Sequence, residues 1–160
     1  MRIFSPGMAF VDLLRANEPE AMAQIRGNTQ NPQLKGVVKF YRTPYSGVLI
    51  EAEIFGLPDK TKPETSGFFA MHIHENGDCT MPFDKTGMHY NPSGDDHPNH
   101  AGDLIPLLSF QGYAWLSFFD KRFQLPAIRG KSVIIHQLPD DFTTQPSGGS
   151  GEKIGCGIIS

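Results

Sequence analysis

Apolar and polar positions alternate with a period of two residues over much of the chain, which is the pattern of β-strands with one buried face. In VLIEAEIF (48–55), Ile50, Ala52 and Ile54 alternate with two glutamates. Segments rich in Val, Ile, Phe and Tyr predict further strands at 34–43, 67–75, 113–119, 132–136 and 154–159, with a weaker candidate at 21–26. Turn residues separate these segments, so the pattern favours a sandwich or a barrel.

Three segments depart from this rhythm. Residues 10–16 predict two turns of a marginal helix, and residues 76–111 and 137–153 are long, polar and loop-like. Long loops in a compact domain are usually functional. We therefore expect an N-terminal lead-in over residues 1–20 and a single domain over residues 21–160.

Composition narrows the class of protein. A chain of 160 residues suits one domain, and 17 Gly with 13 Pro indicate frequent turns. The net charge of −3 argues against a nucleic-acid or anionic-membrane partner, because phosphate binding needs a basic face. No apolar run approaches the ~18 residues of a membrane span. The N-terminal residues lack the apolar core of a secretory signal, so we expect a cytoplasmic protein; the alternative is an extracytoplasmic one whose export signal has been removed.

The two cysteines, Cys79 and Cys156, lie too far apart in the sequence for a metal-binding CxxC motif. They predict either two buried thiols or one long-range bridge.

The histidines are concentrated in one part of the chain. Five of the six lie between residues 72 and 100, where an even distribution would place about one. His72 and His74 are two residues apart on a predicted strand, so both rings point to the same face. Two exposed histidines would give the same spacing, but the histidine-rich loop beside them favours part of a metal site.

The loop supplies more potential ligands. Three histidines and one aspartate make a complete tetrahedral set for zinc: His89, His97, His100 and Asp103. His136, at the end of a predicted strand, joins His72 and His74 only if the barrel closes, and such an imidazole-rich group suits copper as well as zinc. Six histidines and one aspartate make seven ligands, so two four-coordinate ions must share one histidine. The spacing does not indicate which histidine is shared.

Five stretches of the chain resemble the copper,zinc superoxide dismutase family. They are MHIHENGDC (71–79), GMHYNP (87–92), HAGDL (100–104), IIHQLPDD (134–141) and GEKIGCGII (151–159). They occur in the order of the family, and the strand pattern from 21 to 67 fits it without a sharp motif.

The resemblance implies an all-β fold, an eight-stranded antiparallel Greek-key β-barrel that is flattened like a sandwich and carries two long functional loops. It implies copper bound by His72, His74, His89 and His136, and zinc bound by His89, His97, His100 and Asp103, so that His89 is the shared ligand. It also implies a disulfide between Cys79 and Cys156. Asp140 matches a carboxylate that accepts hydrogen bonds from one copper and one zinc histidine; the alternative is a plain turn aspartate.

The resemblance further implies dismutation of superoxide, with His89 as the catalytic proton carrier. Lys153 stands where the family usually has arginine, and we expect it to attract the anionic substrate less rigidly than an arginine would. The loop around the zinc ligands and the loop 137–153 are shorter than in many relatives, so zinc is the less securely held metal. A homodimer is compatible with the family, but the sequence does not indicate the face.

Two other functions fit the same residues. A copper-binding or copper-delivery protein could keep the barrel with little turnover. A zinc hydrolase could use His97, His100 and Asp103, but no general base is evident beside them.

Overall fold

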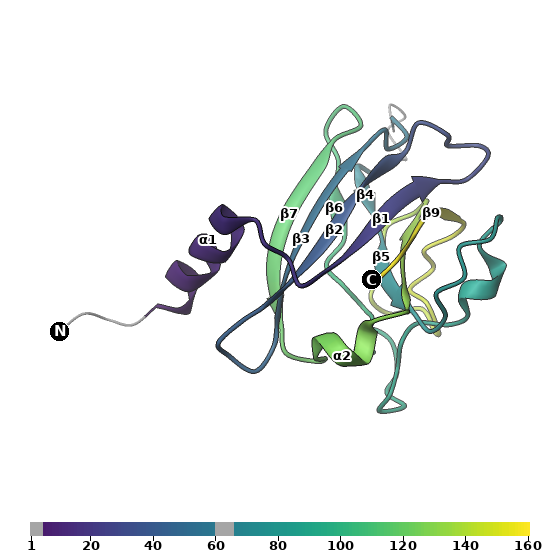
Figure 1. Cartoon of the computed structure of the whole chain (residues 1–160). Coiled ribbons are helices and arrows are strands. Elements are labelled where there is room, and N and C mark those ends of the chain that lie inside the picture. The colour runs from purple at the N-terminus through teal and green to yellow at the C-terminus, as the bar shows by residue number, and fades with distance from the viewer. Residues whose placement is uncertain (1–4, 60–65) are drawn as a thin grey trace.

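The computed structural model describes residues 5–59 and 66–160. Seven strands form one curled antiparallel sheet in the order β5-β8-β9-β1-β2-β3-β7 (Figure 1). Their bounds are β1 Ala21–Gly27, β2 Lys35–Arg42, β3 Val48–Phe55, β5 Met71–His74, β7 Ala114–Asp120, β8 Ser132–His136 and β9 Lys153–Ile158. A second sheet pairs β4 (Phe68–Phe69) with β6 (Leu107–Leu108). The all-β barrel expected from the sequence is confirmed, and the described residues form nine strands where eight were expected.

The core lies inside the curl of the large sheet. Ile50, Ala52 and Ile54 are buried on β3, as their alternation predicts, and β1 alternates in the same way. β8 differs because all five of its residues are buried. One side of β8 faces the core, and the other lies beneath the long loops. This double burial places the end of β8, at His136, in the interior of the protein.

The helices lie outside the barrel. α1 (Pro6–Ala16) begins four residues earlier than the sequence predicts, has no buried residue, and contacts the barrel through Phe10, whose ring stacks on Phe119. Figure 1 shows α1 projecting from one end of the molecule. The described part of the chain has two further helices, both short: η1 (Asp84–Thr86) and α2 (Leu125–Ile128). Among the described residues, no helix has the length and apolar character needed to cross a membrane.

Two details differ from the sequence prediction. The strand expected at 67–75 is divided at Ala70, because β4 pairs with β6 whereas β5 pairs with β8. The segment 76–111, expected to be a loop throughout, contains η1 and β6. The segment 137–153 does form a loop up to Glu152, and β9 begins at the next residue, Lys153.

Candidate metal centre

Four histidines from three parts of the chain meet beside β5. His72 and His74 lie on β5, His136 ends the antiparallel neighbour β8, and His89 forms an isolated backbone bridge with His74. We call this set the four-histidine group: His72, His74, His89 and His136. One nitrogen from each ring lies within 4.8 Å of the others, and all four side chains are buried. The structure therefore brings His136 to the two histidines of β5, as the sequence required for a common site.

Hydrogen bonds fix which nitrogen of each ring faces the centre. Three rings use one nitrogen to contact an oxygen of the protein, and that oxygen can only accept. These contacts join His72 Nε2 to Asp140 Oδ2 at 2.8 Å, His74 Nδ1 to the Gly87 carbonyl at 2.9 Å and His136 Nδ1 to the Gly151 carbonyl at 3.3 Å. In a neutral imidazole one nitrogen carries the proton and the other is a lone-pair acceptor. The nitrogens directed to the centre are therefore the unprotonated ones.

Those inward nitrogens lack ordinary hydrogen-bond partners. His72 Nδ1 and His89 Nε2 are buried with no partner among the described residues, and Nε2 of His74 lies 3.3 Å from Nε2 of His136. Lone pairs that face one another at this distance repel. A buried polar atom without a partner destabilises the fold by ~1–3 kcal/mol. A cation among these four nitrogens removes both penalties.

A second set of ligands lies on the other side of the His89 ring. We call it the aspartate group: His89, His97, His100 and Asp103, again with ligand atoms within 4.8 Å. Asp103 is central to it, because its carboxylate lies 2.8 Å from His89 Nδ1, 3.1 Å from His97 Nδ1 and 3.2 Å from His100 Nδ1. His97 Nδ1 forms no hydrogen bond despite this approach. The His89 ring thus presents Nδ1 to one group and Nε2 to the other.

Asp140 connects the two groups. Its Oδ2 lies 2.8 Å from His72 Nε2 and its Oδ1 lies 2.8 Å from His97 Nε2. Burial raises the pKa of Asp140, but hydrogen bonds from both rings and from the Phe142 amide outweigh it and lower the pKa to about 2. Asp140 is therefore an ionised acceptor that orients one ring of each group. Gly148, at φ +70°, packs against this contact, and a Cβ there would overlap Asp140 and His97.

Burial keeps three histidines of the four-histidine group neutral, namely His72, His74 and His136. It lowers the pKa of His72 to about 4 and that of His74 to about 2, and it lowers the pKa of His136 well below 6.5. Metal binding to histidine requires the neutral ring, so the site is ready for a cation at neutral pH. Four imidazoles suit copper, and three imidazoles with one carboxylate suit zinc. The donor sets therefore fit the two metals that the family resemblance implies.

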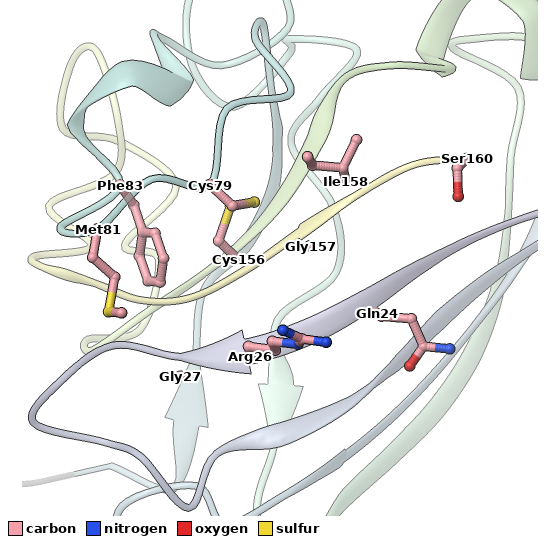
Figure 2. A pocket seen from close by; sticks show the side chains of 10 residues that line it. All are labelled: Gln24, Arg26, Gly27, Cys79, Met81, Phe83, Cys156, Gly157, Ile158 and Ser160. Carbon is pink, nitrogen blue, oxygen red and sulfur yellow. A yellow bond between two sulfur atoms is a disulfide. The ribbon is translucent and has the colours of Figure 1, made fainter.

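The disulfide implied by the resemblance forms between Cys79 and Cys156. It ties the segment after β5 to β9, and Cys156 packs with Phe83 and Ile134. Figure 2 shows the bridge beside a surface pocket of about 460 Å³ that the Phe83 ring also lines. This pocket is lined by none of the seven metal-ligand candidates.

Lys153 lies on the edge of the four-histidine group and is half-buried. Its ammonium donates to Thr86 Oγ1 at 2.8 Å and lies 3.4 Å from the carbonyls of Phe83 and Gly87. The Gly87 carbonyl is also the partner of His74 Nδ1. Burial lowers the pKa of Lys153, and its positive charge in turn contributes to the lowered pKa values of His74 and His136.

A pocket of about 330 Å³ reaches the shared histidine from the side of the aspartate group. His89 and His100 line it together with Glu75, Asp95 and Asp96. Three carboxylates at this opening favour the approach of a cation and disfavour that of an anion.

Several contacts of the centre escaped the sequence interpretation. The carbonyls of Gly87 and Gly151 fix the orientation of two rings, but a backbone atom leaves no side-chain signal in the sequence. Thr86, the partner of Lys153, lies in a stretch without a distinctive pattern. The one sequence signal for Thr86 is its position three residues before His89.

The fold and the centre together define a class of protein: a β-barrel with two buried ligand groups that share one imidazole. Residues 34–159 match the family model described as copper/zinc superoxide dismutase. The chain therefore belongs to the copper/zinc superoxide dismutase family.

Individual relatives agree with this assignment. The chain is 32% identical over 142 residues to a Cu-Zn superoxide dismutase of Caulobacter vibrioides, covering 78% of this chain and 77% of that protein. It is 31% identical over 140 residues to the human copper chaperone for superoxide dismutase, covering 79% of this chain but 48% of the chaperone. A crystal structure of a double mutant of a SOD-like protein from Bacillus subtilis superposes with a TM-score of 0.75 at 27% identity, covering 86% and 95% of the two chains.

Proposed function

We propose that this chain is a superoxide dismutase, which converts two superoxide anions and two protons into dioxygen and hydrogen peroxide. The observation that carries the proposal is the buried His89 ring, whose Nδ1 lies 2.8 Å from Asp103 and whose Nε2 faces the other group without a partner. We assign copper to the four-histidine group and zinc to the aspartate group. Copper, when bound, supplies one-electron transfer by alternating between two oxidation states.

His89 is the proposed proton carrier, and Nε2 is the atom that holds the proton. Its Nδ1 is committed to the aspartate group, so only Nε2 is free to gain and lose a proton. Nε2 is buried and has no hydrogen-bond partner among residues 5–59 and 66–160. A proton on Nε2 therefore has no competing acceptor in the described part of the chain when a basic product lies beside it.

Lys153 is proposed to supply positive charge for the incoming anion. Its N–H groups face three acceptors of the segment 83–87, so this contribution is long-range attraction and not a direct hydrogen bond to superoxide. The same contacts hold the Gly87 carbonyl against His74. A lysine held in this way attracts an anion without the two-pronged binding that an arginine offers.

The test is the rate of superoxide loss after a pulse, measured on protein loaded with copper and zinc. We expect a rate proportional to bound copper. The variant His136→Asn, which removes one copper ligand, should lose this rate, whereas Gln137→Asn at the exposed neighbouring position should retain it. A copper-loaded protein that leaves the decay of superoxide unchanged would exclude the proposed activity.

The second candidate is a copper-binding or copper-delivery protein. Two observations favour it: the similarity to the human copper chaperone, and the lysine at position 153. A carrier releases copper to an acceptor protein or chelator within the time of an assay, whereas an enzyme retains it. Copper exchange that is fast compared with superoxide turnover would favour the carrier.

We also propose that two copies of the chain pair through the outer face of β3, β6 and β7. Large apolar side chains are exposed there: Phe55, Leu108, Phe110, Tyr113 and Trp115. Large apolar side chains that are exposed together are a common feature of protein–protein interfaces. Sedimentation should show a dimer that Trp115→Glu dissociates and that Val11→Glu, on α1, leaves intact; a monomeric parent protein would contradict the proposal.

A further inference from the structure

We infer that Arg122 and Gln145 are positioning residues that hold the backbone of the aspartate group, and that the chain retains its second metal through them. Neither residue is a metal ligand, and neither contacts the four-histidine group. The inference rests on the proposed function in one respect only, which is that the aspartate group binds a metal. It does not depend on superoxide turnover.

The aspartate group needs such support because of where its ligands lie. His97, His100 and Asp103 fall within seven residues of a loop that contains no helix or regular strand. Fixing the backbone of one residue costs about 1–2 kcal/mol in conformational entropy. Ligands on a loop that is ordered only by the metal bind that metal more weakly than ligands held in place beforehand.

Arg122 holds the second half of this loop. Its Nη1 donates to the carbonyl of His100 at 3.0 Å and its Nη2 donates to the carbonyl of Asp103 at 2.5 Å. One planar guanidinium thus fixes the backbone of two ligands at once. A lysine in the same place has a single nitrogen and cannot reach both carbonyls with the same geometry.

Asp120 anchors the Arg122 side chain to the barrel. Its carboxylate accepts from Nε at 3.1 Å, from Nη2 at 2.6 Å and from the Arg122 amide at 2.8 Å. Asp120 is buried at the end of β7, where it pairs with Val48 of β3. The carbonyls of the two ligands are therefore tied to the rigid edge of the large sheet.

Gln145 holds the first ligand of the loop from the opposite side. Its Oε1 accepts from the backbone amide of His97 at 2.9 Å, and its Nε2 donates to the His97 carbonyl at 2.7 Å. The side-chain amide therefore satisfies both backbone groups of one ligand. Gln145 comes from the loop 137–153, which also carries Asp140, the partner of the His97 ring.

We call the hydrogen bonds of Arg122 and those of Gln145 to the ligand backbone the two clamps. They hold different ligands and come from different elements. Arg122 connects His100 and Asp103 to the sheet, and Gln145 connects His97 to the neighbouring loop. Because Asp103 also lies 3.1 Å from His97 Nδ1, both clamps act on the geometry of the same ligand group. Together they offer a physical reason why a loop shorter than in many relatives can still hold a metal.

The test measures transfer of zinc from the zinc-loaded protein to an excess of a chromogenic chelator, for the parent protein and for Arg122→Gln, Arg122→Lys and Gln145→Ala. Matched controls are Arg129→Gln, where an arginine donates to the Glu20 carbonyl far from the centre, and Gln124→Ala, an exposed glutamine. We expect release about tenfold faster in each clamp variant, within the range for residues that support metal ligands. The double variant should release zinc faster than either single variant.

Cobalt placed in the aspartate group gives a second readout. Its visible absorption reports ligand geometry, and we expect an altered spectrum in the clamp variants and an unchanged one in the controls. Arg122→Lys retains the positive charge but loses the two-pronged guanidinium. It therefore separates the effect of two simultaneous hydrogen bonds from that of charge alone. It also serves if Arg122→Gln fails to fold.

Several results would overturn the inference. One is zinc release and cobalt spectra equal to those of the parent, with only the melting temperature lowered, because a merely structural contact gives that pattern. Another is a parent protein that binds neither zinc nor cobalt at this group. A protein that binds zinc tightly in a clamp-dependent way but consumes no superoxide would refute the proposed function and leave this inference standing.

Discussion

Removing the cross-link between Cys79 and Cys156 should destabilise the protein strongly. The two residues are separated by 77 positions, so the bridge closes a loop of nearly half the chain. In the chain-entropy model, loss of a loop of this size lowers the free energy of unfolding by about 4.5 kcal/mol at 25 °C. That is a large share of the ~5–15 kcal/mol that stabilises an ordinary domain.

The variant should change the cross-link with little change in packing. Cys156 is buried against Phe83 and Ile134, so alanine is the better replacement there, because a serine hydroxyl would lack a partner. Cys79 is partly exposed and tolerates serine. The pair Cys79→Ser and Cys156→Ala is compared with the oxidised parent and with the parent after reduction, all without metal. Reduction removes the bond alone, which separates the entropy of the loop from the loss of sulfur contacts.

Urea unfolding followed by circular dichroism gives the free energy. With a slope near 2 kcal/mol per molar urea for a domain of this size, the midpoint should fall by roughly 2 M. Both the variant and the reduced parent should show this decrease. A loss below about 1 kcal/mol in both would refute the reasoning, because it would mean that the unfolded chain is already restricted without the bond.

Three further predictions concern Asp140, the buried histidines and Lys153. Asp140→Asn offers only one acceptor oxygen to the rings of His72 and His97, so the affinity for at least one metal should fall about 10–100-fold in chelator competition; unchanged affinity for both metals would contradict the bridging role. Burial places the folded-state pKa of His72 at about 4 and that of His74 at about 2, both below 6.5, so the folded metal-free protein binds fewer protons than the unfolded chain. Its stability should be retained above about pH 7 and lost as the pH falls through 6.5 towards 4, as measured by urea midpoints across this range; a rise on acidification would reverse the sign and reject the assignment. Lys153→Met should slow superoxide loss and weaken its dependence on ionic strength, with Lys131→Met as the control; an unchanged salt dependence would remove Lys153 from substrate attraction.

The ligand pattern on the strands could be predicted from the sequence because it depends on a local period. His72 and His74 share a face for the same reason that Ile50 and Ile54 share one: alternate residues of a strand point the same way. The meeting with His136 needed more than spacing. It depends on the pairing of β5 with β8, which the resemblance supplied and the periodicity did not.

Contacts made by the backbone or by unremarkable polar residues could not be predicted. Arg122 follows β7 in a stretch with no metal-binding pattern, and its targets are carbonyl groups 19 and 22 positions away in the sequence. The division of the predicted strand at Ala70 has the same origin. It reflects pairing with two different partners, which no local pattern encodes.

The central proposal is that one ring, His89, would be a ligand of both metals, through Nε2 in the four-histidine group and Nδ1 in the aspartate group. Electron paramagnetic resonance of protein loaded with copper in the four-histidine group and cobalt in the aspartate group tests it most directly. A shared imidazole couples the two paramagnetic ions, so the copper signal seen with zinc present should be lost when cobalt replaces zinc. A copper signal that persists unchanged beside an independent cobalt signal would show that the ions do not share the ring and would contradict the account.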